Sequence, residues 1–213
     1  MKVRVLFKTL GMLLITTLLF ASTNAEKPTA ETFYQLGLQN TDNAEYSEAI
    51  DAFTHAIKLK PEFADAHYNL GLAYYKIHRY EEALAAFKET VKVKSDHADA
   101  YFSIGTLSSM FSKYKDAITA LRKTVKLEPK NADALYALGN VFSEVERFEE
   151  AVQAYKKAVN IRPKFAEARY NLGIAYLGFR NQLLESAQDE YASLKKLNKE
   201  LAEDLNSKLP RHK

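Results

Sequence analysis

Glycine recurs at a fixed interval along the chain, and this interval constrains the fold more than any other feature of the sequence. The chain has 213 residues and only seven glycines. Five of them follow one constant spacing, at Gly37, Gly71, Gly105, Gly139 and Gly173. A fixed period of about 34 residues is typical of repeat architectures, in which each unit buries its apolar face only by stacking on its neighbours. We therefore expect a stack of similar units.

Other residue types follow the same period. In the first unit Leu36 precedes the glycine, Ala49 and Phe53 follow it, and Pro61 closes the unit. The apolar residues of each unit recur with the period of an α-helix in two runs, which a short polar turn separates. Each unit is therefore predicted to be a helix, a turn and a second helix that a proline ends. Glycine in the first helix and alanine in the second leave room for close packing of the two backbones.

This pattern resembles the tetratricopeptide repeat family, which has the same period and whose Leu-Gly, Tyr, Ala, Phe and Pro spacing is matched here. The segment 66–74 (AHYNLGLAY) is similar to the first helix of that family. The resemblance implies an all-α, right-handed helical solenoid with a concave groove. Four full units are predicted, at residues 30–63, 64–97, 98–131 and 132–165.

A fifth unit, residues 166–199, departs from the pattern. Glu185 stands where the repeat alanine is expected, and the pattern resumes two residues late at Ala187. We infer a two-residue insertion in the turn around residues 178–182. Residues 200–213 continue a helical leucine stripe, which predicts a capping helix and a tail that close the open end of the stack.

The N-terminal segment, residues 1–25, has the composition of an export signal. Lys2, Arg4 and Lys8 carry charge, whereas residues 9–25 carry none and end in small residues. A basic start, a short apolar run and a small-residue end predict a signal peptide at 1–25, followed by a linker at 26–29. An uncleaved membrane anchor is the alternative, since the uncharged run approaches the length of a bilayer span. We expect an exported protein, periplasmic or secreted, that is membrane-anchored if the segment is retained.

Charge and cysteine content exclude several classes of function. The formal net charge is +3, and removal of residues 1–25 leaves 27 Lys and Arg against 27 Asp and Glu. This balance disfavours nucleic acid as a partner. No cysteine is present, which excludes thiol catalysis and a bacterial lipoprotein anchor. The sequence also has no zinc-protease, phosphate-loop or hydrolase motif. We predict no catalytic residue, cofactor or metal site, and hence not an enzyme.

One flank of each first helix carries an aromatic ring. Counting Ala30 as position 1 of the repeat, position 5 is aromatic in all units: Tyr34, Tyr68, Phe102, Tyr136 and Tyr170. One interpretation is packing against the neighbouring first helix. The other is a ladder of rings that the groove presents to a peptide.

Position 2 of each unit is acidic, at Glu31, Asp65, Asp99, Asp133 and Glu167. Carboxylates in a first helical turn complement the helix dipole, which explains the residue type. Stacked along the groove, they also form an acidic wall. Chaperone-binding members of the family grip a carboxylate tail with basic residues, and no such basic clamp occurs here.

The sequence therefore predicts recognition of a neutral to basic protein or peptide, with contact to a membrane only if the N-terminal segment is retained. Amide side chains could bond the partner's backbone. Besides the rings and acids already named, the candidate groove residues are Asn69, Leu72, Thr106, Asn140 and Asn171.

Overall fold

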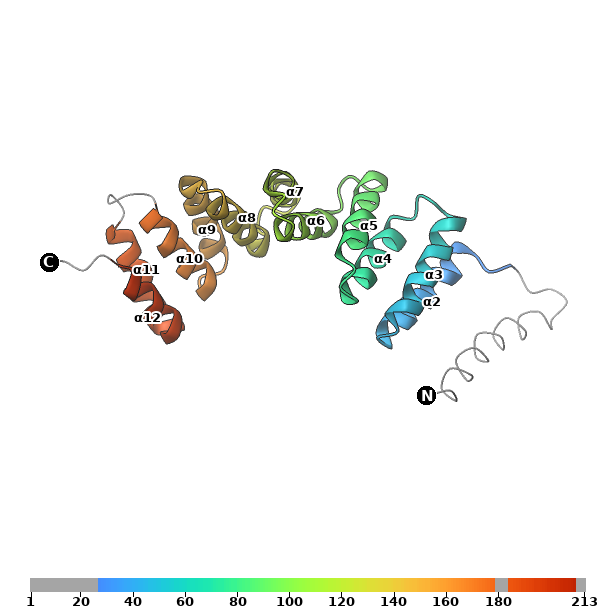
Figure 1. The fold of residues 1–213 in the computed structure, drawn as a ribbon, viewed down its shortest axis with the longest axis horizontal. Helices are drawn as coiled ribbons and strands as arrows, with labels where there is room; N and C mark the ends of the chain where they lie inside the picture. Colours follow the sequence, from blue (N-terminus) through green and yellow to red (C-terminus); the bar gives the residue numbers. More distant parts are fainter. Residues whose placement is uncertain (1–26, 179–183, 210–213) are drawn as a thin grey trace.

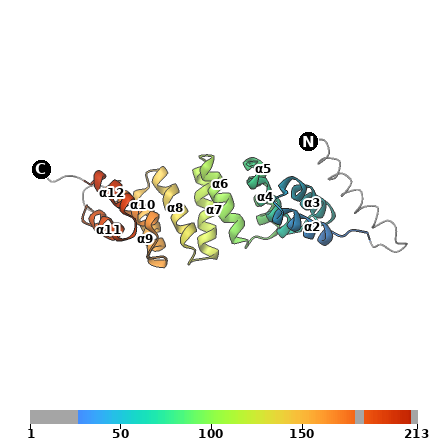
Figure 2. The same cartoon turned by 90° about the horizontal axis from the view of Figure 1, so that it is seen from below.

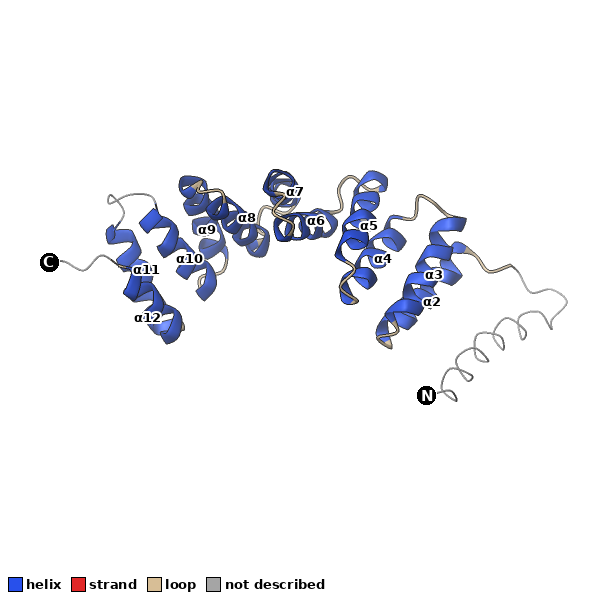
Figure 3. Cartoon of the chain, viewed as in Figure 1, coloured by secondary structure: helices blue, strands red, loops and turns tan. Residues whose placement is uncertain are grey.

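A computed structural model describes residues 27–178 and 184–209 of the chain. The predicted signal peptide or anchor at 1–25, residue 26 of the linker, most of the predicted insertion and the last residues of the tail lie outside the described residues. Helices and loops account for the whole of the described part (Figure 3).

Eleven α-helices are described, and each of the five units contributes a pair. The first helices of the units are α2 (Ala30–Asp42), α4 (Ala64–Lys76), α6 (Ala98–Met110), α8 (Ala132–Glu144) and α10 (Ala166–Gly178). The second helices are α3 (Tyr46–Leu59), α5 (Tyr80–Val93), α7 (Tyr114–Leu127), α9 (Phe148–Ile161) and α11 (Leu184–Leu197), and α12 (Lys199–Lys208) follows. The predicted all-α solenoid of paired helices is confirmed.

The turns within the units share one backbone feature that the sequence pattern did not reveal. Four described turns each hold one residue other than glycine in the left-handed region, with φ between 55° and 62°: Ala44, His78, Ser112 and Glu146. Each of these residues occupies position 15 of its unit. The left-handed conformation reverses the chain after the first helix, and side chains with a Cβ adopt it at an energetic cost.

The repeat glycines touch the large side chains of the second helices. A Cβ built on Gly37 would lie 2.4 Å from Cε1 of Phe53, and one built on Gly139 would lie 2.5 Å from Cε1 of Tyr155. Both rings are essentially fully buried. Glycine is therefore required where the first helix lies directly on the ring, a contact with the large residue of the second helix rather than with its alanine.

The C-terminal end differs from the other units. The second helix begins at position 17 of the unit in four units, whereas α11 begins at position 19 of the fifth. The capping helix α12 contacts both α10 and α11. A Cβ built on Gly173 would lie 2.7 Å from Leu205 of α12, so the capping helix provides the contact that a second-helix side chain makes elsewhere.

The units form an elongated arch (Figure 1). Helix α6 lies toward the inside of the arch and α7 toward the outside, and the view from below shows the same consecutive order of helix pairs (Figure 2). Each unit contacts the next through its second helix, and first helices of neighbouring units also touch, as α2 touches α4. This stacking exposes one side of every first helix, which we call the first-helix face: the side chains at positions 2, 5, 6, 9, 12 and 13.

Candidate functional site

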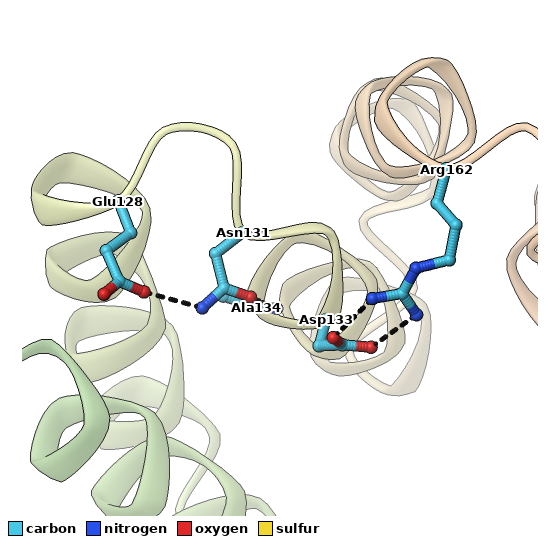
Figure 4. Close-up of polar contacts among 5 residues, drawn as sticks. All are labelled: Glu128, Asn131, Asp133, Ala134 and Arg162. Carbon is cyan, nitrogen blue, oxygen red and sulfur yellow. Dashed lines mark hydrogen bonds and ion pairs between the residues drawn. The ribbon is translucent and has the colours of Figure 1, made fainter.

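The acidic residues at position 2 all lie in the first turn of a first helix and are all exposed. Asp133 forms a two-point ion pair with Arg162 at the end of α9, with Nη1 2.9 Å from Oδ1 and Nη2 2.7 Å from Oδ2 (Figure 4). This hydrogen bonding is the main cause that raises the pKa of Arg162. The acidic wall is therefore neutralised in the fourth unit.

In the second and third units the acidic residues are not paired in this way. Within the described residues, neither Asp65 nor Asp99 has a basic side chain within ion-pair distance. The pKa of Tyr34 is raised, mainly by burial and then by the charge of Asp65. Burial and the charge of Asp99 likewise raise the pKa of Tyr68. In both cases burial is the main cause of the raised pKa, and the carboxylate at position 2 of the next unit is the second.

The tyrosines at position 5 of the first and fourth units pack on the phenylalanine that ends their own unit. The ring of Tyr34 lies 4.7 Å from that of Phe63, and the ring of Tyr136 lies 4.8 Å from that of Phe165, measured between centroids. All five position-5 rings are half-buried. This arrangement favours packing over a ladder of presented rings, because these rings already contact neighbouring side chains.

The tyrosine hydroxyls at position 5 are bonded as well. Asn69 Nδ2 donates to the Tyr34 hydroxyl at 3.1 Å, and Asn171 Nδ2 lies 3.3 Å from the Tyr136 hydroxyl, so amides of one unit bond the ring of the unit before. At the C-terminal end the Tyr170 hydroxyl donates to the carboxylate of Asp204 in the capping helix.

The predicted amides are thus engaged within the protein. Asn140 Oδ1 accepts from the Tyr155 hydroxyl at 2.7 Å and from Asn171 Nδ2 at 2.8 Å. Together these groups form a polar network that links the fourth and fifth units. Burial raises the pKa of Tyr155 to about 12. Asn140 and Asn171 therefore stabilise the contact between units, and a partner would have to displace these bonds to use their amides.

Other side chains of the first-helix face are open to solvent. Thr106 is exposed, and Leu72 is half-buried. Tyr75 is 46% exposed and Met110 is 52% exposed, so both offer apolar area to solvent. Neither was among the candidate groove residues predicted from sequence. Their positions, 12 and 13, vary in residue type between units, so the repeat pattern did not mark them.

A second concave feature lies where two units meet, and sequence analysis did not predict it. A hollow of about 700 Å³ is lined by residues 128–133 together with Ile161 and Arg162. Within it Asn131 caps α8, accepting from the Ala134 amide at 2.9 Å and donating to Glu128 at 2.8 Å (Figure 4). One sequence signal could have indicated a contact here: the unit that holds the acidic Asp133 at position 2 also holds the basic Arg162 at position 31.

The part of the chain that the structure describes contains neither a metal-binding group nor a candidate membrane span. No group of three or more His, Asp or Glu side chains is placed to hold a metal ion there. Across residues 27–178 and 184–209, none of the helices has both the length and the apolarity that a membrane span needs.

Solved structures share the fold over most of the chain. A crystal structure of MamA protein is 26% identical, with a TM-score of 0.75 over 82% of this chain and 94% of the other. The crystal structure of YrrB, described as a TPR protein with an unusual peptide-binding site, is 21% identical, with a TM-score of 0.78 over 85% and 94% of the two chains. MamA from Desulfovibrio magneticus RS-1 is 20% identical, with a TM-score of 0.72 over 80% and 96%. Among curated proteins, none matches in sequence.

Family models give the assignment. A model described as TPR repeat matches residues 41–77, 112–145 and 144–178, and one described as tetratricopeptide repeat matches residues 64–97. The matched segments span more than half of the chain and fall on helices of all five units. The chain belongs to the tetratricopeptide repeat family.

Proposed function

We propose that this protein is a non-catalytic, exported scaffold whose first-helix face binds a neutral to basic segment of a partner protein. Membership of a family built from stacked recognition units supports the binding role. The fold-level likeness to YrrB, which has a peptide-binding site, agrees with it. The observation that carries the proposal is the pair of exposed acids, Asp65 and Asp99, at the start of helices that end in the exposed Tyr75 and Met110.

Charge and apolar area would act together in such binding. Asp65 and Asp99 have no basic partner within the described residues, so a basic segment could pair with them without breaking an existing ion pair. Tyr75 and Met110 lie at the other end of the same two helices and offer apolar area to the partner. Because Asp133 is paired with Arg162, we expect binding to centre on α4 and α6.

Synthetic peptides test this specificity. We would compare a labelled Lys- and Leu-containing peptide with a Glu- and Leu-containing peptide of the same length, using fluorescence anisotropy at two salt concentrations. The basic peptide is expected to bind more tightly, with an affinity that falls as salt screens the charges. Asp65→Lys with Asp99→Lys should weaken it by about tenfold, since two exposed pairs contribute up to ~1 kcal/mol each.

A matched control separates recognition from net charge. Asp116→Lys with Glu149→Lys makes the same charge change in the first turns of the second helices α7 and α9. This variant should leave the affinity for the basic peptide within about twofold of the original. Equal weakening by both variants would show that only the net charge matters, and tighter binding of the acidic peptide would refute the proposed specificity.

Export is a separate part of the proposal and rests on the sequence of residues 1–25. The intact mass of the protein recovered from its cells tests it. Loss of residues 1–25 supports an exported, soluble scaffold. Retention of these residues would favour the alternative, a membrane-anchored assembly factor of an envelope complex, and would leave the proposed binding face unchanged.

A further inference from the structure

Charge is unevenly distributed between the two long edges of the solenoid. Because each unit is an antiparallel helix pair, all turns within units lie at one edge and all junctions between units lie at the other. We call the second edge the junction edge: residues 58–62, 92–96, 126–130, 160–164 and 195–199. These segments contain eleven Lys and Arg and three Asp and Glu, a net charge of +8.

The opposite edge has the reverse sign. Residues 42–48, 76–82, 110–116 and 144–150, which we call the turn edge, contain five Lys and Arg and ten Asp and Glu. The acids at position 2 begin the first helices beside the junction edge and offset part of its charge. When all five are counted with it, the junction edge still has a net charge of +3.

Each junction also carries an aliphatic side chain where a second helix ends. It stands at position 30 of the first four units and, past the insertion, at Leu197 of the fifth. Four of these side chains are 38% to 55% exposed: Leu59, Val93, Ile161 and Leu197. Successive junctions lie side by side, since Ile161 lines a hollow with residues 128–133 and Leu197 lines another with Pro163. The junction edge is thus a row of exposed aliphatic residues flanked by basic ones.

We propose that the junction edge lies on an anionic lipid bilayer, with the aliphatic residues inserted at the headgroup level and the basic residues contacting lipid phosphates. Lys and Arg beside exposed aliphatic side chains are the composition that binds such an interface, because the apolar atoms leave water while the charges stay at the headgroups. The proposal is independent of the first-helix face and goes beyond the proposed function.

The position of the N-terminus supports a bilayer as the occupant. The chain enters α2 at Ala30, and the start of a first helix lies at the junction edge. Only eight residues separate Ala30 from Ala21, where the apolar run of the sequence ends, a reach of at most about 30 Å. In a form of the protein that retains residues 1–25, a membrane that held this apolar run would lie within that reach of the start of α2, which is at the junction edge. The nearby apolar run gives no reason to expect an acidic protein or a second copy of the chain at the junction edge.

Fluorescent labels on the full chain test the orientation. The chain has no cysteine, so a single introduced cysteine takes an environment-sensitive label uniquely. Ile161→Cys places the label at the junction edge, and Glu144→Cys places it at the turn edge of the same unit. In vesicles that contain phosphatidylglycerol and nitroxide-labelled lipid, we expect quenching at residue 161 and much less at residue 144. The difference should shrink in 1 M salt, where the screening length falls to about 3 Å.

Charge reversal provides the second arm. Lys94→Glu, Lys126→Glu and Lys164→Glu combined alter three junctions, and each lysine contributes about fivefold to binding of an anionic surface. This variant should lose the quenching difference between the two labels. The matched control reverses Lys76, Lys113 and Lys115 at the turn edge, and should keep it. Circular dichroism checks that both variants fold.

Three results would overturn the proposal. Equal quenching at both labels would show that neither edge faces the bilayer. A difference of the same size in neutral phosphatidylcholine vesicles would show that the N-terminal tether alone sets the orientation. If charge reversal changed sedimentation of the vesicle-free protein but not quenching, the junction edge would instead be an interface between copies of the chain.

Discussion

Substitution of Gly71 by alanine tests the contact that sets the distance between the two helices of a unit. A Cβ at residue 71 would lie 2.6 Å from Cε1 and 2.7 Å from Cδ1 of Phe87, whereas ordinary contacts begin at 3.4 Å. Phe87 is 1% exposed, and its ring also packs on Tyr68 at 5.6 Å, so it has little room to move. The helices must therefore separate or the ring must leave its preferred rotamer.

The expected magnitude follows from two opposing effects. Overpacking of a buried site costs about 1–3 kcal/mol. Alanine in place of glycine in a helix interior stabilises the helix by about 1 kcal/mol, because its helix propensity is higher. We expect Gly71→Ala to lower the free energy of unfolding by up to about 2 kcal/mol, measured by urea denaturation followed by circular dichroism.

Two further variants identify the cause of the loss. Ala85→Gly, at an exposed position of α5, should cost about 1 kcal/mol and so measures the propensity term alone. Phe87→Leu combined with Gly71→Ala should cost less than the sum of the two single changes, because the smaller side chain relieves the overlap. If Gly71→Ala were instead more stable than the original protein, as the higher helix propensity alone would make it, the proposed glycine–ring contact would be wrong.

Three further predictions concern single buried or strained groups. Ser108 is fully buried, and its hydroxyl has no hydrogen-bond partner within the described residues. Ser108→Ala should therefore raise the free energy of unfolding by about 1–2 kcal/mol, and a variant less stable than the original protein in urea denaturation would contradict this. Glu146→Gly should raise it by up to about 1 kcal/mol, because glycine adopts the positive φ without strain, and no gain in melting temperature would count against strain there. Burial raises the pKa of Tyr155 to about 12, so its stabilising contribution is complete below pH 10 and is lost as the pH rises from 10 to 12. Between pH 10 and 11 the free energy of unfolding of Tyr155→Phe should therefore fall by about 1 kcal/mol less than that of the original protein, and equal losses would refute the assignment.

Much of the fold follows from the sequence because the same residue types recur at the same positions. The constant spacing of glycine, alanine and a large apolar residue determines which helices pair and how closely they approach. Local choices are harder to predict. The partner of Gly173 is Leu205 of the capping helix, since the second helix of the fifth unit begins two residues late, and no repeat position predicts that exchange.

The candidate site was less predictable, because it depends on side chains that differ between units. The aromatic residues at position 5 could have faced either the core or the groove, and only the structure shows Tyr34 and Tyr136 packed on the phenylalanines that end their own units. Whether the acid at position 2 forms an ion pair depends on the residue at position 31 of its unit. Arg162 neutralises Asp133, whereas Glu128, at the equivalent position of the third unit, cannot form an ion pair with Asp99. Individual substitutions, not the repeat, therefore define the charge of the face.

Mapping of a bound basic peptide by amide chemical shifts tests the central claim most directly. A two-dimensional ¹H–¹⁵N spectrum of the protein would be recorded with increasing amounts of the Lys- and Leu-containing peptide. The account predicts that the largest shifts fall on the first helices α4 and α6, around Asp65, Tyr75, Asp99 and Met110. Shifts confined to the second helices, or equal shifts with the Glu- and Leu-containing peptide, would contradict recognition by the acidic first-helix face.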